Sequence, residues 1–191
     1  TNSSDIRIVN LKTFNCELVS GHTDIVLAVT VSSDGHYIAS VSKDRTVNVF
    51  RIGDGTESTK RIGCGKGHTE SVGAVAFGNS PIHSGTPPIL LTGSLDKTIK
   101  AWDMRSMLMS LEDDEEEIED DSNESVVYAL RVRTSSLAHD MDINCMAVSP
   151  NDKMAATASK DKTIKLWSME TLRDNEEIKL LSVLRGHKRG V

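Results

Sequence analysis

The sequence predicts an all-β fold built from repeated units of four short strands. Three observations support this prediction. Apolar residues recur at the two-residue period of a strand. Turn residues separate these runs at short, regular distances. A Gly-His or Ala-His pair, an aspartate in a short polar turn and an aromatic residue also recur three times in the same order. A chain of 191 residues with this period is predicted to be a repeat array.

The strand pattern can be followed along the whole chain. Polar turns rich in aspartate, asparagine and glycine favour tight connections between antiparallel strands. A proline-containing loop at residues 78–88 replaces one short turn and is expected on the surface. The expected strands cover residues 6–11, 16–20, 25–31, 37–42, 46–52, 61–65, 71–77, 89–94, 98–104, 126–133, 143–148, 154–159, 163–167 and 178–184.

The spacing inside the repeats is regular. His22 precedes Asp44 by 22 residues, and the third repeat has the same spacing. His68 precedes Asp96 by 28 residues because the proline-containing loop lies between them. The aromatic residue follows the aspartate by six positions in every repeat. These units predict repeats at about residues 16–52, 61–104 and 126–169, with partial repeats at 1–15 and 178–191.

This order of residues resembles the pattern of WD-repeat proteins, which fold as β-propellers of four-stranded blades. The resemblance implies that each repeat supplies the outer strand of one blade and three inner strands of the next. The chain is then a partial WD-repeat β-propeller of about three complete blades plus half a blade. Closed propellers typically have about 4–8 blades, so the chain is expected to be a fragment of a longer protein.

The recurring polar residues are expected to meet at one end of each blade. In an antiparallel meander, the histidine connection and the aspartate turn fall at the same end of the sheet. The resemblance implies hydrogen bonds that join these residues to a hydroxyl and a tryptophan indole. Phe50 has no N–H donor at the tryptophan position, so the first blade is expected to be the weakest of the three. The sets are His22, Ser40, Asp44 and Phe50; His68, Thr92, Asp96 and Trp102; and His139, Thr157, Asp161 and Trp167.

A hydroxyl, a histidine and an aspartate also form the catalytic group of serine hydrolases. We interpret the three sets as structural, because an active site is not built three times at a fixed period and no nucleophile-elbow motif accompanies them. Cys16, Cys64 and Cys145 lack zinc-ligand spacing, and Cys145 is expected to pack as a small hydrophobe. The sequence therefore predicts no enzyme, no catalytic or metal site, no cofactor and no small-molecule substrate.

Charge is distributed unevenly along the chain. The net charge is −6, but residues 112–124 hold ten acidic residues and no basic ones, which leaves a net charge of +4 on the rest. Residues 106–125 are expected to form a disordered acidic insertion on the face opposite the aspartate turns. Ser110, next to this acidic run, is a candidate phosphorylation site. The aspartate turns carry a candidate basic face that either meets phosphates or is simply solvated: Lys43, Arg45, Lys97, Lys160 and Lys162.

The sequence also indicates the cellular environment of the protein. No apolar run approaches the ~18 residues that would span a bilayer, so no membrane contact is expected. Few cysteines and no disulfide framework favour a reducing compartment.

Several phrases resemble one family more closely than the repeat alone requires. They include HTDIVLA from His22, GHTESVGAV from Gly67 and SPNDKMAATASKD from Ser149. Across residues 16–191 the chain resembles the transducin beta-like protein 3 family of U3 small nucleolar RNA-associated WD-repeat proteins. The resemblance implies a scaffold for assembly of the small-subunit processome and for pre-ribosomal RNA processing, in the nucleus and nucleolus. Its candidate partners are other WD-repeat processome proteins and U3 small nucleolar RNA or pre-ribosomal RNA.

Two alternatives remain open from the sequence. Residues 90–105 resemble the box by which WD-repeat substrate receptors dock on cullin ubiquitin ligases. Arg105, three residues after Trp102, is the distinguishing element of that box, and the rest of it is ordinary repeat sequence. The other alternative is a generic protein-interaction scaffold.

Overall fold

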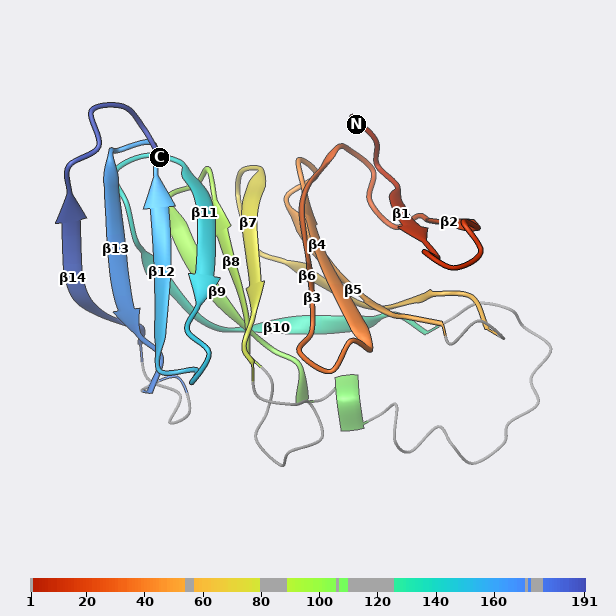
Figure 1. Ribbon diagram of the computed structural model, residues 1–191. Helices are drawn as coiled ribbons and strands as arrows, with labels where there is room; N and C mark the ends of the chain where they lie inside the picture. The colour runs from red at the N-terminus through yellow and green to blue at the C-terminus, as the bar shows by residue number, and fades with distance from the viewer. Residues whose placement is uncertain are drawn as a thin grey trace.

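A computed structural model describes residues 2–53, 57–79, 89–105, 107–109, 126–170, 172 and 177–191. These residues form fourteen β-strands and a helical turn at residues 107–109. The strands group into a two-stranded hairpin and three four-stranded blades that stand side by side (Figure 1). The structure confirms the predicted all-β partial propeller of three blades and half a blade.

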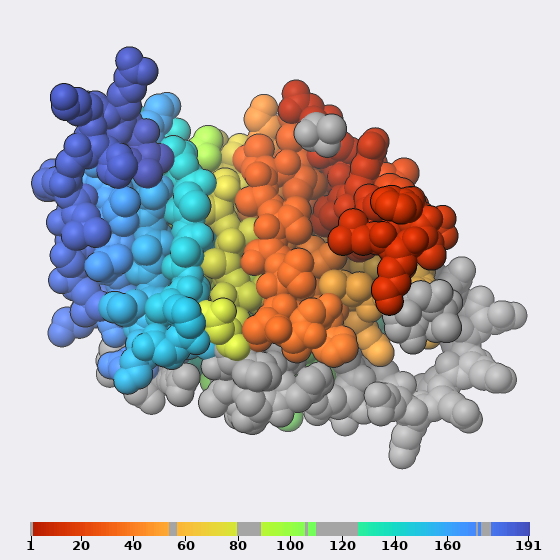
Figure 2. Space-filling model, viewed as in Figure 1, coloured from red at the N-terminus to blue at the C-terminus, as the bar shows by residue number. Residues whose placement is uncertain are grey.

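The hairpin and the blades follow one another in chain order, as the successive colour bands of Figure 2 show. The N-terminal hairpin is formed by β1 (Ile6–Val9) and β2 (Cys16–Val19). The first blade contains β3 (Val26–Val31), β4 (Tyr37–Ser42), β5 (Thr46–Arg51) and β6 (Lys60–Lys66). The second contains β7 (Val72–Phe77), β8 (Ile89–Ser94), β9 (Thr98–Asp103) and β10 (Tyr128–Leu137). The third contains β11 (Ile143–Val148), β12 (Met154–Ser159), β13 (Thr163–Ser168) and β14 (Lys179–Arg185).

One long strand joins the outer edges of the first and second blades. Residues 128–130 of β10 pair in parallel with residues 63–65 of β6. Residues 131–137 of the same strand pair antiparallel with β9. In Figure 1, β10 runs across from the first blade to the second. The two blades therefore share one eight-stranded sheet of order β3-β4-β5-β6-β10-β9-β8-β7, whereas the third blade is a separate sheet.

The hydrophobic core lies between neighbouring blades. One cluster, which includes Val41, Leu90 and Trp102, fills the space between the first and second blades. A second cluster, which includes Leu91 and Ile143, joins the second and third blades. A smaller cluster seats the hairpin on the first blade. Each fully buried branched or aromatic side chain contributes about 1.5–3 kcal/mol, so stacking of the blades supplies most of the stabilisation.

Each innermost strand carries an irregularity near its start. The pairing shifts between Val26 and Ala28 in β3, and equivalent shifts occur in β7 and β11. In β11 the shift lies between Ile143 and Cys145. Such a bulge reverses the alternation of side chains that follows it. Cys145 is consequently exposed, and the prediction that it packs in the core is wrong.

Polar contacts fasten the blades and the hairpin outside the apolar clusters. Asn79, in the connection after β7, donates its backbone N–H to Asp152 of the third blade at 2.6 Å and its side-chain amide to the Ser149 carbonyl at 2.9 Å. On the other side, Glu17 of the hairpin accepts the backbone N–H and the hydroxyl of Thr59, at 2.6 and 2.8 Å. Within the described residues, no helix is long and apolar enough to cross a membrane.

Candidate functional site

The second and third blades each hold a four-residue hydrogen-bonded network at one end. In the second blade the Trp102 indole N–H donates to the Thr92 hydroxyl at 2.8 Å. That hydroxyl is 2.8 Å from His68 Nε2, and His68 Nδ1 is 2.8 Å from Asp96. The imidazole also meets the indole edge-on, with ring centroids 6.2 Å apart. The structure thus brings together all four predicted residues of this blade.

The third blade repeats these distances. The Trp167 indole donates to Thr157 at 2.8 Å, and the same hydroxyl lies 2.8 Å from His139 Nε2. His139 Nδ1 lies 2.8 Å from Asp161. Because an ionised carboxylate can only accept, the neutral imidazole carries its proton on Nδ1 and donates it to Asp161, and Nε2 accepts the proton of the Thr157 hydroxyl. The carboxylate therefore selects one neutral histidine tautomer.

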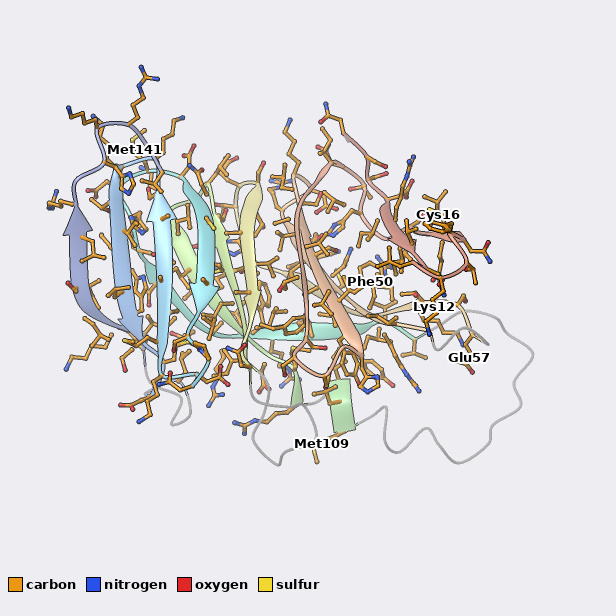
Figure 3. All side chains as sticks on the ribbon, in the orientation of Figure 1. Lys12, Cys16, Phe50, Glu57, Met109 and Met141 are labelled. Atoms are coloured by element: carbon orange, nitrogen blue, oxygen red, sulfur yellow. The ribbon has the colours of Figure 1, made fainter. Side chains whose placement is uncertain are left out.

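The first blade has the same network without its last donor. His22 contacts Ser40 at 2.8 Å and Asp44 at 2.9 Å. Phe50 fills the tryptophan position, is 1% exposed and packs with Ile6 of the hairpin. Figure 3 shows Phe50 between β5 and the hairpin. The ring contributes apolar contact but leaves the serine hydroxyl without an indole N–H.

A threonine that the sequence reasoning did not single out completes each network. Thr46, Thr98 and Thr163 each follow the network aspartate by two residues. Their hydroxyls donate to the aspartate Oδ1 at 2.6 Å and lie 3.1–3.3 Å from the histidine Nδ1. The fixed offset of two residues in every repeat was the signal that could have identified them.

The aspartate turn has the same backbone shape in all three blades. The residue after the aspartate is left-handed in each case: Arg45 has φ 69°, and Lys97 and Lys162 both have φ 71°. A serine before the turn accepts the aspartate N–H, as Ser42 does for Asp44 at 3.1 Å. Left-handed φ is uncommon for side chains other than Gly, Asn and Asp, so the surrounding hydrogen bonds hold these three basic residues in place.

The network carboxylates are held in the ionised form. Burial opposes ionisation of Asp96, but hydrogen bonds from His68, Thr98 and the Thr69 backbone outweigh it and hold its pKa well below the usual range. The pKa values of Asp44 and Asp161 are lowered in the same way. Burial lowers the pKa of His139 despite its contact with Asp161. A neutral imidazole beside a carboxylate agrees with the tautomer selected by the hydrogen bonds.

The residues of the candidate basic face lie in the equivalent turns β4–β5, β8–β9 and β12–β13. Lys43, Arg45, Lys97, Lys160 and Lys162 are all exposed. Lys160 approaches Asp142 at 3.5 Å, an exposed contact that contributes little to stability. Ser110 and most of the acidic insertion lie outside the described residues. Arg105 is exposed just after β9, and its backbone N–H donates to Asp103.

The network histidines are almost entirely buried, with little of each imidazole reaching the surface. The histidines of the three networks are 8%, 6% and 2% exposed, and the hydroxyls that they contact are at most 1% exposed. Among the residues that the structure describes, no group of three His, Cys, Asp or Glu side chains could hold a metal ion. The arrangement is suited to fixing strands rather than to binding a substrate.

Comparison with known proteins agrees with this geometry. The family model described as "WD domain, G-beta repeat" matches residues 11–51, 59–103 and 131–168. Over 191 residues the chain is 35% identical to transducin beta-like protein 3 of Homo sapiens, covering all of this chain and 21% of that protein. It is 33% identical over 201 residues to U3 small nucleolar RNA-associated protein 13 of Saccharomyces cerevisiae, covering all of this chain and 22% of the relative.

The chain thus spans about one fifth of the length of these curated relatives. The three matched segments overlap the three blades and include each aspartate turn with its aromatic residue. From these matches and from the blade geometry, we conclude that the chain belongs to the WD-repeat family.

Proposed function

We propose that the chain is part of a non-catalytic WD-repeat scaffold that assembles the small-subunit processome and supports pre-ribosomal RNA processing. The observation that carries the proposal is similarity along the entire chain to a U3 small nucleolar RNA-associated protein. Similarity to transducin beta-like protein 3 covers the same residues. The proposed location is the nucleus and nucleolus.

A scaffold role is favoured by how the polar groups of the blades are used. Ser40, His22 and Asp44 have the hydrogen-bond order of a hydrolase triad, at 2.8 and 2.9 Å. The Ser40 side chain is nevertheless fully buried, so a substrate cannot reach its hydroxyl. In the other two blades the equivalent hydroxyl is already engaged by an indole N–H. These groups fix the blades and leave the surface loops and blade faces free for partners.

The proposed partners are other WD-repeat proteins of the processome, together with U3 small nucleolar RNA or pre-ribosomal RNA. The exposed turns of the three blades offer Arg45, Lys97 and Lys162 in equivalent positions. Repeated cations along one end of the blades are suited to contacts with phosphates. The alternative docking on a cullin ligase gains no support from the relatives named above.

Affinity purification of the tagged full-length protein tests the proposal. We expect U3 small nucleolar RNA and processome proteins to be recovered by RNA sequencing and mass spectrometry. Arg105→Ala should leave this recovery unchanged, because the Arg105 side chain is exposed and lies outside the networks. Recovery of a cullin adaptor in place of U3 RNA, and its loss in Arg105→Ala, would overturn the proposal.

A further inference from the structure

A groove of about 820 Å³ opens where the His22 connection, β6 and the start of β10 meet. This volume falls in the range of about 300–1,000 Å³ that is typical of ligand sites. The groove exists because residues 128–130 of β10 extend the first blade beyond β6 and add a fifth strand to its edge. Residues 127–130 form one wall, and the connection around Gly21 and Thr23 forms another.

Three cations line this groove without acidic partners. They are Arg45 from the aspartate turn, and Arg61 and Lys66 from β6. Within the described part of the chain, none of the three is paired with a carboxylate. Arg61 donates one N–H to the Gly21 carbonyl at 2.8 Å, which fixes its position and leaves other N–H groups of the guanidinium for a ligand.

The acidic residue in the lining, Asp44, offsets one of the three positive charges, so the groove keeps a net positive charge. Both oxygens of Asp44 are already engaged. One oxygen contacts His22 and the Thr23 backbone, and the other contacts the backbone and hydroxyl of Thr46. Cys64, also in the lining, adds no negative charge, because burial raises the pKa of its thiol although Arg61 and Lys66 lower it.

The walls of the groove distinguish between two kinds of anionic ligand. Single-stranded RNA is usually held by several aromatic side chains that stack on its bases. Tyr128 is the single aromatic residue apart from His68 in the lining. The wall formed by β10 also presents Val127 and Ala129, which suit aliphatic side chains, whereas Leu130 packs into the core between the blades. Carboxylates for the cations and aliphatic groups for this wall occur together in an acidic peptide.

We propose that the groove between β6 and the start of β10 binds an acidic peptide segment of a partner protein, whose carboxylates are held by Arg45, Arg61 and Lys66. This proposal does not rest on the role in ribosome assembly, since it follows from the shape and charge of the groove. Either proposal can fail while the other holds.

Fluorescence anisotropy with a labelled polyglutamate peptide and the full-length protein tests the proposal. The test variant is Arg45→Asn with Lys66→Gln, because both side chains are exposed and asparagine tolerates the left-handed backbone at residue 45. The loss of two ion pairs should weaken binding about tenfold. The matched control is Lys97→Asn with Lys162→Asn, which also removes two positive charges. Both lysines hold the turn position that Arg45 has in the first blade, but they lie outside the groove.

The control should change the affinity by less than about twofold. Equal weakening by both double variants would show general electrostatic attraction and overturn the proposal. An oligouridylate probe serves as the RNA arm. Tight binding of this RNA that depends on Arg45 and Lys66, without binding of the peptide, would also overturn it.

Cys64 supplies a second, local measurement. Alkylation of each cysteine can be followed by mass spectrometry with and without the peptide. A peptide seated in the groove covers the Cys64 thiol, so its alkylation should slow several-fold, while the exposed Cys16 and Cys145 react as before. Unchanged alkylation of Cys64 at a saturating peptide concentration would contradict binding in the groove.

Discussion

Single side chains decide how complete each network is. Trp102 and Trp167 each add one indole hydrogen bond that Phe50 cannot make. A buried hydrogen bond contributes about 0.5–1.5 kcal/mol, and the first blade lacks one such bond although the Ser40 hydroxyl keeps its bond to His22. The first blade compensates in part by packing its phenyl ring against the hairpin.

Replacing Trp167 by Phe should copy the first-blade network into the third blade. We expect the free energy of unfolding to fall by about 1–3 kcal/mol, because one hydrogen bond and part of the indole contact are lost. Urea denaturation followed by circular dichroism measures the change. Thr157→Val should cost at least as much, since both His139 and Trp167 lose their partner. A Trp167→Phe protein as stable as the wild type would contradict the assigned hydrogen bond.

Acid should weaken the fold in two stages. The folded pKa of His139 is below its ordinary value of 6.5, so below that pH the unfolded chain binds more protons and stability falls with falling pH. The pKa values of three network aspartates are lowered: Asp44, Asp96 and Asp161. Their contribution to the free energy of unfolding is complete above pH about 3.8 and is lost as the pH falls below that value. Thermal unfolding between pH about 7.5 and about 5 should show a falling melting temperature, with a shallower slope in His139→Gln. An unchanged slope in this variant would exclude His139 as the cause.

At the scale of whole elements, the close contact between blades depends on glycines in the strands. A Cβ atom on Gly65 of β6 would lie 2.6 Å from Val47 and 2.7 Å from the Trp102 ring. On Gly93 of β8 it would lie 2.6 Å from Ile143 in the third blade. These glycines therefore let neighbouring blades pack against each other at a distance that larger residues would prevent.

Gly65→Ala should push Trp102 away from the first blade. We expect a loss of about 1–3 kcal/mol of unfolding free energy from overpacking. Gly78→Ala is the matched control, because a Cβ there meets its nearest atom, in the Asp152 carboxylate, at an ordinary 3.4 Å. Tryptophan fluorescence and urea denaturation would show whether Gly65→Ala alone perturbs the Trp102 environment. Equal stability of the two variants would contradict this account.

The strands could be predicted closely from sequence, whereas their tertiary partners could not. Alternation and turn residues placed β4, β8, β11 and β12 at their observed bounds, because strand and turn preferences are local. The pairing of residues 128–130 with β6 depends on where a long insertion returns, and no local pattern encodes that. Cys145 was misplaced because a bulge shifts the alternation by one residue.

In the candidate site, too, the features encoded by local spacing could be predicted, and those that depend on tertiary pairing could not. The fixed spacing identified each network histidine and aspartate, and the structure places them within hydrogen-bonding distance. The basic groove could not be predicted. Arg61 and Lys66 lie outside the repeated turn, and the groove forms only where β10 crosses to the first blade.

At the scale of the whole molecule, the strands of the third blade are less buried than those of the first two blades. The six residues of β4 in the first blade and of β8 in the second are all buried. By contrast, the equivalent strand of the third blade, β12, is only partly buried, and its outermost strand β14 is exposed along most of its length, with Leu181 50% and Leu184 47% exposed. Local opening is favoured where few apolar contacts hold a strand, so the blades should differ in protection.

Hydrogen exchange resolved by strand tests this order. We expect β14 to exchange fastest, because of its exposure. Between β4 and β8, which are equally buried, β4 should exchange faster because the Phe50 network lacks the indole bond. This comparison separates the effect of the network from the effect of coverage. Equal protection of β4 and β8 would show that the missing donor has no effect on blade stability.

The strand shared between the first two blades limits how the repeats can be recombined. A gene segment cut between β6 and β7 would separate β6 from residues 128–130, its partner at the outer edge. A transplanted first blade would then lose one wall of its groove, and a transplanted second blade would carry residues 128–130 without the strand that they pair with. The first two blades can therefore be moved only as a pair, whereas the third blade, a separate sheet, is the natural place for a junction.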